Sequence, residues 1–261
     1  MELLFSEAGR QRLEQVVHEQ MLCAFDFDGT LAPIVPKPDQ AYLPASVRLR
    51  LQELVRHAPV AILTGRSLQD IRRRIGFEPH HVLGNHGIEG LPGWETRSQQ
   101  YRELCSRWER MLTAVFRENA QFDPGIEIEN KTYSLSVHYR HTRDPGRSER
   151  QLAQLFATLL PEARVVDGKF LYNLLPAGAE DKGSAIKKLL QMTGARSAIY
   201  VGDDVTDEDV FRLHHPDILS VRVEASQDSE AEWYLAEPDD IILLLDDLIS
   251  RLRQARMKAI A

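Results

Sequence analysis

The chain has 261 residues, 43% of them hydrophobic and 27% charged, which is ordinary composition for a globular protein of one large domain or two small ones. Its net charge of −7 provides no general positive field, so nucleic acid is not an expected partner. No stretch is apolar over enough of its length to predict a membrane span or a secretion signal. The two cysteines lack metal-type spacing and imply no disulfide framework, which favours a reducing, cytoplasmic setting.

The first third of the chain alternates strand patterns with helix patterns. Residues 21–27 and 59–65 are continuous apolar runs, as expected of strands that are buried on both faces. Residues 46–58 have helical spacing, Ser67 is suited to cap a second helix, and a third short strand is expected at 81–87. This alternation predicts a parallel sheet with helices on both faces.

The middle third has a different pattern. Helical spacing occurs at 101–116 and again at 147–160. Residues 132–139 alternate strictly between apolar and polar side chains, which predicts a strand of an antiparallel sheet with one face in water. The dipeptide Asp167-Gly168 suits a tight turn, so we expect a hairpin around it.

The last third returns to the α/β pattern. A helix is expected at 181–192 and a buried strand at 197–204. They are followed by a short helix, a further strand and a closing helix at 206–213, 218–223 and 238–252. We therefore predict an α/β core built from residues 1–92 and 178–261, with an α+β cap domain inserted at 93–177.

Four polar clusters follow the predicted strands or begin a helix. They are Asp26-Phe27-Asp28-Gly29-Thr30, Thr64-Gly65-Arg66, Lys182-Gly183, and Gly202-Asp203-Asp204 with Asp207 beyond. Each cluster alone has an ordinary explanation, such as a turn or an acidic helix start. In a parallel sheet, however, ligands bind beyond the carboxyl ends of the strands, where all four clusters would meet. Their joint occurrence favours a functional site.

Carboxylates that converge on one rim repel one another, and a bound cation relieves that repulsion. Oxygen ligands favour a hard cation such as Mg²⁺, which takes one or two carboxylates together with phosphate oxygens of a substrate. Thr64 and Lys182 would supply a hydrogen-bond donor and a positive charge for that phosphate. Asp26 and Asp28 would then form a working pair, nucleophile and acid/base, for hydrolysis of a phosphomonoester.

The motifs DFDGT, TGR, KG and GDD, in this order, resemble the four motifs of the haloacid dehalogenase (HAD) superfamily of phosphatases. The resemblance implies a Rossmann-like parallel-sheet core with an inserted cap. It implies that Asp26 is the nucleophile and Asp28 the general acid/base. It further implies that Thr64 binds the phosphoryl oxygens and that Lys182 neutralises their charge.

The same resemblance implies a metal site. Mg²⁺ would be held by Asp26, the backbone carbonyl of Asp28, and Asp203. Asp204 and Asp207 would be alternative ligands or would support the first three.

Longer segments resemble the trehalose-6-phosphate phosphatase family over most of the chain. They are FDFDGTLAPIVPKPDQA, LTGR, GNHGIE, EIENKTYSLSVHYR and VGDDVTDED. The resemblance implies hydrolysis of trehalose 6-phosphate in trehalose biosynthesis, with a small-molecule sugar phosphate as the partner. We expect the protein to be a monomer. Substrate contacts are expected at Gly65, Arg66, Glu129, Lys131, His138, Arg140 and Asn173.

One residue departs from this family pattern. Asn173 stands where the family has a glutamate, and an asparagine binds a sugar hydroxyl without the charge. A different glycosyl or sugar phosphate is therefore an alternative substrate. On the residues alone, Glu129 and Lys131 also fit a surface ion pair, and His138 an exposed histidine. Two further hypotheses for the whole chain are mutase-like phosphoryl transfer and a binding module without catalysis.

Overall fold

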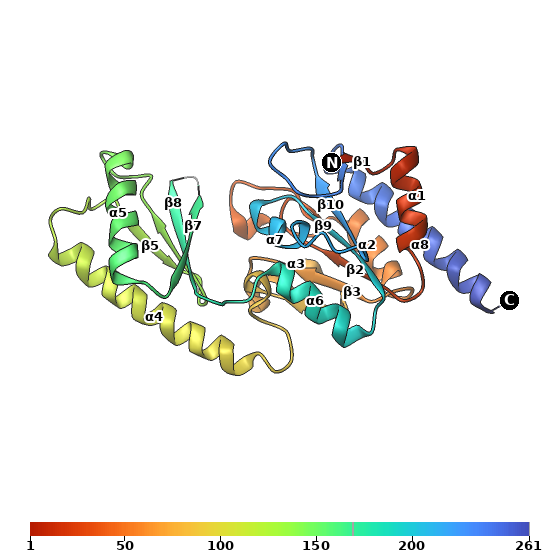
Figure 1. Cartoon of the computed structure of the whole chain (residues 1–261), viewed down its shortest axis with the longest axis horizontal. Coiled ribbons are helices and arrows are strands. Elements are labelled where there is room, and N and C mark those ends of the chain that lie inside the picture. Colours follow the sequence, from red (N-terminus) through yellow and green to blue (C-terminus); the bar gives the residue numbers. More distant parts are fainter. Residues whose placement is uncertain (169, 261) are drawn as a thin grey trace. The chain divides into compact units, whose positions relative to one another are not determined.

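The computed structural model describes residues 1–168 and 170–260 (Figure 1). The chain forms two compact units, each with its own sheet. The larger unit contains Met1–Leu91 and Glu180–Ala261, and the smaller unit contains Pro92–Ala179. The smaller unit is thus inserted into the sequence of the larger one.

The larger unit contains a seven-stranded sheet in which neighbouring strands are parallel. In spatial order the strands are β1 (Glu2–Leu3), β11 (Trp233–Leu235), β10 (Ile218–Val223), β9 (Ser197–Gly202), β2 (Met21–Phe25), β3 (Val60–Leu63) and β4 (His81–Leu83). Every residue of β9, β2 and β3 is buried, which accounts for their continuous apolar sequences. Because these strands are parallel neighbours, their carboxyl ends lie at one edge of the sheet.

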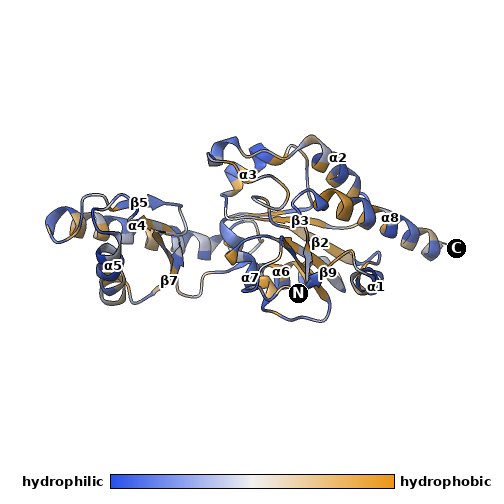
Figure 2. Ribbon diagram, turned by 90° about the horizontal axis from the view of Figure 1, so that it is seen from above, coloured by the Kyte–Doolittle hydropathy of each residue, from blue (hydrophilic) through white to orange (hydrophobic). Residues whose placement is uncertain are grey.

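Helices surround this sheet. They are α1 (Glu7–Val16), α2 (Ala45–Leu54), α3 (Leu68–Ile75), α6 (Lys182–Thr193), α7 (Glu208–Phe211) and α8 (Asp240–Ile260), with 3-10 turns η1 (Pro38–Gln40), η2 (Asn85–Gly87) and η3 (Val205–Asp207). Apolar side chains of α1, α2, α3 and α8 join one buried cluster with alternate strand residues, such as Cys23 and Phe25. Strand residues on the other face meet different helices: the ring of Tyr200 packs edge-on against Phe211 of α7. Figure 2 shows the apolar strands in orange between helices that are partly blue.

The smaller unit is an antiparallel sheet packed on two helices. Its strands lie in the order β5 (Glu127–Asn130), β6 (Leu135–His138), β8 (Leu171–Pro176) and β7 (Ala163–Gly168). Helices α4 (Glu95–Glu118) and α5 (Pro145–Leu159) supply buried side chains such as Trp108 and Phe156. Alternate strand residues, including Val137 and Tyr172, complete this second core. The intervening strand residues therefore lie on the other, more polar face.

The predicted fold class is confirmed, since a parallel sheet with helices is joined to a separate antiparallel sheet. The antiparallel strand expected within 132–139 is confirmed as β6. The expected hairpin is confirmed as the antiparallel pair β7 and β8, but its dipeptide Asp167-Gly168 lies in a strand and not in the turn: Asp167 pairs with Tyr172, and Gly168 pairs with Leu171. Cross-strand pairing thus extends β7 through a dipeptide that favours turns locally. None of the helices in the described part of the chain has the length and hydropathy needed to cross a membrane.

Candidate active site

Three strand ends of the larger unit carry polar side chains. Asp26 directly follows β2, Thr64 follows β3 and Asp203 follows β9. The ladder of hydrogen bonds continues past two of these ends. The amide of Asp26 donates to the carbonyl of Val201 over 2.8 Å, and that of Thr64 donates to Leu83 over 3.0 Å. The backbone at Asp26 and Thr64 is therefore held by the sheet itself.

Lys182 begins α6, and its side chain is only 2% exposed. The ammonium group donates to Asp26 Oδ1 over 2.6 Å and to Asp207 Oδ1 over 2.7 Å. Burial by itself lowers the pKa of Lys182, but the charges of Asp207 and Asp26 outweigh burial and raise the pKa. The lysine therefore stays charged, and the third hydrogen of its ammonium group is available for another acceptor.

Asp207 is fully buried and accepts four hydrogen bonds. Its Oδ1 accepts from Lys182 and, over 2.5 Å, from the hydroxyl of Tyr200. Its Oδ2 accepts from the backbone amides of Asp203 and Asp204, both over 2.9 Å. Burial raises the pKa of Asp207, but the charge of Lys182 and these hydrogen bonds lower it overall. A carboxylate has about four lone-pair positions, so all those of Asp207 are occupied.

Within residues 1–168 and 170–260, Asp26, Asp203 and Asp207 form a group of acids that could hold a metal ion, with one oxygen of each within 4.8 Å of the others. Burial raises the pKa of Asp26 well above its usual value, against the opposing charge of Lys182. Burial, and after it the charge of Asp207, raises the pKa of Asp203 to about 7. A bound cation would supply the positive charge that these two carboxylates lack. Since Asp207 is already saturated, Asp26 and Asp203 fit best as metal ligands.

The side chains of Asp28 and Asp204 lie outside that group. Asp204 is exposed and precedes η3. Asp28 is bound on both oxygens by Arg66, whose Nε and Nη2 each donate over 2.6 Å. Arg66 also donates to Asp70 over 2.8 Å, and its guanidinium lies 5.7 Å from the centre of the Phe27 ring. A bidentate ion pair thus joins the DFDGT motif to the TGR motif and fixes the orientation of Asp28.

Gly29 shows why the first motif needs a glycine. Its φ of +84° is in the region that side chains disfavour, and a Cβ there would clash with the carboxylate of Asp203. The next residue, Thr30, donates its hydroxyl to Asp203 Oδ1 over 3.1 Å. The chain therefore turns sharply after Asp28 and passes directly against Asp203, which brings the first and last motifs together.

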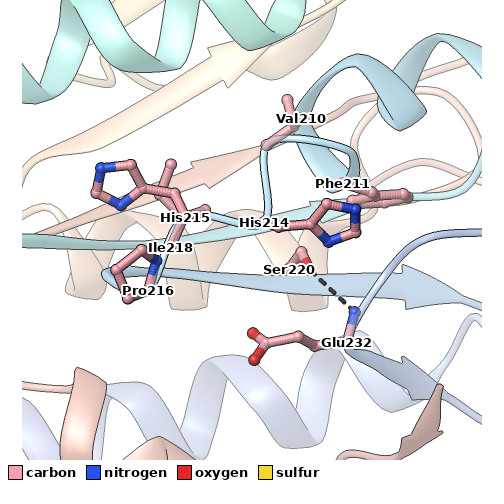
Figure 3. A pocket seen from close by; sticks show the side chains of 8 residues that line it. All are labelled: Val210, Phe211, His214, His215, Pro216, Ile218, Ser220 and Glu232. Carbon is pink, nitrogen blue, oxygen red and sulfur yellow. Dashed lines mark hydrogen bonds between the residues drawn. The ribbon is translucent and has the colours of Figure 1, made fainter.

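A cavity of about 280 Å³ opens beside this cluster. Its lining includes Gly29 and Asp203, together with Pro33, Ile34, Arg222, Val223, Glu224, Ala225 and Pro238. A smaller cavity of about 140 Å³ lies at the amino end of β10, where the imidazole rings of His214 and His215 point in different directions (Figure 3). Because β10 is parallel to β9, this smaller cavity lies at the opposite sheet edge from Asp203. The acids clustered at the carboxyl ends of β2 and β9, beside the cavity that Asp203 lines, identify this edge of the sheet as the candidate active site.

A family model described as trehalose-phosphatase matches residues 24–239, a range that contains all four motifs. The chain belongs to the trehalose-phosphatase family. A trehalose-phosphate phosphatase of Mycobacterium tuberculosis is 31% identical to it over 94% of this chain, which spans 65% of that relative's length.

Solved structures agree with this family. A trehalose-6-phosphate phosphatase of Aspergillus fumigatus is 26% identical, with a TM-score of 0.66 over 92% of this chain and 97% of its own. A haloacid dehalogenase-like hydrolase of Bacteroides thetaiotaomicron is 15% identical and has a TM-score of 0.56 over 87% of this chain and 99% of its own, a likeness of fold alone. The HAD-type fold is thereby confirmed, and family and fold together make the chain a phosphatase.

Several residues expected to contact substrate lie in the smaller unit, on the polar face of its sheet. Glu129 of β5 is directly across from Ser136 of β6, which is across from Asn173 of β8. The hydroxyl of Ser136 donates to Asn173 Oδ1 over 2.6 Å. Glu129 lies 3.1 Å from His138 Nε2 and 3.8 Å from Lys131 Nζ. The structure thus gathers Glu129, Lys131 and His138 in one cluster, with Asn173 two strands away.

Arg140 and Gly65 have different surroundings. Arg140 lies two residues beyond β6, with its guanidinium 6.0 Å from the centre of the Phe170 ring, a cation–π distance. Gly65 lies against the ring of His86, since a Cβ at Gly65 would be 2.6 Å from His86 Cε1. The substrate role of both residues stays a prediction.

The sequence did not predict the contacts by which three side chains support the site, although Thr30 belongs to the first polar cluster and Glu89 to the GNHGIE segment. Tyr200 binds Asp207, and Thr30 binds Asp203. The carboxylate of Glu89 accepts from the amide of Leu68 over 2.9 Å and from Asn85 Nδ2 over 2.8 Å, and so holds the start of α3 after the TGR motif. Only Tyr200 had a usable signal, because a hydroxyl in a fully buried strand requires a partner.

Replacing Lys182 by methionine tests the buried ion cluster. The variant leaves Asp26 and Asp207 buried without their cation, so we expect the free energy of unfolding at neutral pH to fall by about 3–5 kcal/mol. Urea denaturation without divalent metal measures this value. Arg253→Met is the matched control, because Arg253 pairs with Glu53 at 2.6 Å but is 56% exposed, and its loss should cost less than about 1 kcal/mol. Equal losses in the two variants would show that the buried cluster contributes no more than a surface pair.

Proposed function

We propose that this chain is a Mg²⁺-dependent phosphatase that hydrolyses trehalose 6-phosphate to trehalose and phosphate through an aspartyl-phosphate. The main support is one observation: Lys182 joins Asp26 to Asp207 at the end of β2, with Asp203 alongside. A carboxylate, a cation and a cluster that accepts a metal are the components that phosphoryl transfer to an aspartate requires. Membership of the trehalose-phosphatase family supports the choice of sugar phosphate.

In the first proposed step, a carboxylate oxygen of Asp26 attacks phosphorus. The bond between phosphorus and the sugar oxygen breaks, and Asp28, protonated on an oxygen that has left Arg66, gives its proton to the sugar oxygen, which releases the sugar. In the second step Asp28 takes a proton from water, whose oxygen attacks phosphorus. The bond to Asp26 then breaks, and phosphate and the free carboxylate are formed. Asp28 has to exchange one contact with Arg66 for the sugar oxygen in each cycle.

The charge that develops on the transferring phosphoryl group needs fixed donors. The third hydrogen of the Lys182 ammonium group and the hydroxyl of Thr64, which is 1% exposed, are the donors that we assign to it. Asp26 and Asp203 would hold Mg²⁺, as would the backbone carbonyl of Asp28, and the ion would supply further positive charge there when bound. The burial of Asp26 excludes water that would otherwise weaken these interactions.

The sugar is assigned to the polar sheet face of the smaller unit. Glu129 would accept hydrogen bonds from sugar hydroxyls, Lys131 would donate to them, and His138 would contact them through its second ring nitrogen, Nδ1. Asn173 Oδ1 already accepts a hydrogen bond from the hydroxyl of Ser136. The NH₂ group of Asn173 would therefore be the part of its side chain that binds the sugar, as a donor to a hydroxyl oxygen. A neutral donor at this position also favours our second candidate, a phosphatase of another glycosyl phosphate.

Replacing Asp26 by asparagine removes the proposed nucleophile while keeping the size of the side chain and an oxygen that accepts from Lys182. We expect phosphate release from trehalose 6-phosphate to fall by more than about a thousandfold, with a melting temperature close to that of the unchanged protein. Asp246→Asn, at an exposed ion pair with Arg50, is the control and should retain full activity. Activity that survives in Asp26→Asn would overturn the mechanism.

A panel with sucrose, glucose and trehalose phosphates then decides between the two candidate substrates.

The pKa of Asp203 predicts how metal binding depends on pH. With a pKa of about 7 in the metal-free protein, Asp203 is mostly protonated below that pH and must lose its proton to bind a cation. MgCl₂ at millimolar concentration should therefore raise the melting temperature more at about pH 8 than at about pH 6. Differential scanning calorimetry measures the shift, and Asp203→Asn should abolish it. An equal shift at both pH values, or one that survives in Asp203→Asn, would argue against this site.

A further inference from the structure

Tyr200 lies in the middle of β9, fully buried, directly behind the acids of the candidate site. Its hydroxyl donates to Asp207 Oδ1 over 2.5 Å, and its ring packs edge-on against Phe211 at 6.0 Å between centroids. This hydrogen bond goes to neither of the two acids that fit as metal ligands, and the proposed mechanism does not use the hydroxyl. A buried hydroxyl in such a hydrogen-bond network usually fixes the position of the groups that it binds.

Asp207 is the point through which Tyr200 could act. The oxygen that accepts from Tyr200 is the same oxygen that accepts from Lys182. The other oxygen accepts from the backbone amides of Asp203 and Asp204. One carboxylate therefore determines both where the lysine ammonium lies and how the loop that carries Asp203 is held.

The hydroxyl is suited to this task. Burial, and after it the charge of Asp207, raises the pKa of Tyr200 well above its ordinary value, so the group remains a neutral donor. With the hydroxyl present, Lys182 shares Oδ1 with a second donor and also binds Asp26. Without it, Oδ1 would have Lys182 as its one remaining donor, and the ammonium would be drawn toward Asp207 and away from Asp26.

We propose that Tyr200 is a positioning residue for phosphoryl transfer, whose hydroxyl holds the Asp207 carboxylate so that Lys182 reaches Asp26 and the phosphate. This inference rests on the proposed phosphatase function. Tyr200 touches no reacting atom, so it acts through Asp207. Its loss should affect the chemical step more than the binding of substrate.

The test is Tyr200→Phe in the full-length protein with Mg²⁺, which keeps the ring against Phe211 and removes only the hydroxyl. Both trehalose 6-phosphate and p-nitrophenyl phosphate serve as substrates. We expect kcat to fall about tenfold on both, the size expected for one hydrogen bond to a charged group, with KM little changed. Tyr172→Phe is the matched control: this tyrosine is also buried, but its hydroxyl donates to the carbonyl of Glu149, and kcat should be unchanged.

A second measurement separates positioning from packing. In an Asp207→Asn background, the further change Tyr200→Phe should have little additional effect on kcat, because the carboxylate that Tyr200 holds is already gone. The melting temperatures of all variants are recorded in parallel. The same tenfold loss in both backgrounds, or a kcat of Tyr200→Phe within twofold of the unchanged protein, would overturn the inference. An unchanged protein that releases no phosphate from either substrate would overturn the proposed function, and this inference with it.

Discussion

The candidate site depends on one buried interaction, the ammonium group of Lys182 held between Asp26 and Asp207. A charged lysine that is 2% exposed is costly unless its hydrogens are bound by charged partners. The two partners come from distant parts of the chain, since Asp26 is 156 residues before Lys182 and Asp207 is 25 residues after it. The ion cluster can form only when β2, β9 and α6 are assembled in their native arrangement. Folding of the larger unit and construction of the site are therefore the same event.

The negative charges of the cluster are not equally compensated, and this difference suits the cluster to bind a cation. Asp207 is saturated by four donors and serves as an internal anchor. Asp26 and Asp203 are less well compensated, and burial raises the pKa of both. The site thus lacks positive charge where a metal ion and a phosphate would enter. Nearby, Arg66 holds Asp28 outside the acid cluster, so that two aspartates two residues apart have different partners and can have different roles.

Much of this could be predicted from the sequence, for a physical reason. Continuous apolar strands followed by acids indicate a parallel sheet with a polar rim, and the order of the motifs places Asp26, Thr64 and Asp203 on that rim. Side chains whose role is to hold other residues of the site in place could not be identified from these patterns. Nothing in the local sequence shows that Thr30 binds Asp203 or that Glu89 holds the start of α3, because these contacts exist only after the chain has folded.

The smaller unit shows the same limit. The alternation of apolar and polar residues correctly predicted the antiparallel strand β6. The Asp167-Gly168 dipeptide was wrongly predicted to form a turn, because its local preference for a turn is weaker than its pairing with β8. The register that aligns Glu129, Ser136 and Asn173 across three strands depends on that pairing. A shift of register by one residue would turn these polar side chains into the core, so the apolar face determines where they lie.

The central claim is that Asp207 is an anchor and that the metal ion belongs to Asp26 and Asp203. Diffraction from crystals grown with MnCl₂ tests this most directly, because anomalous scattering locates the ion independently of the protein. We expect a peak coordinated by the carboxylates of Asp26 and Asp203, with Asp207 still bound by Lys182 and Tyr200. A peak coordinated by Asp207, or one that lies away from Asp26, would contradict the claim.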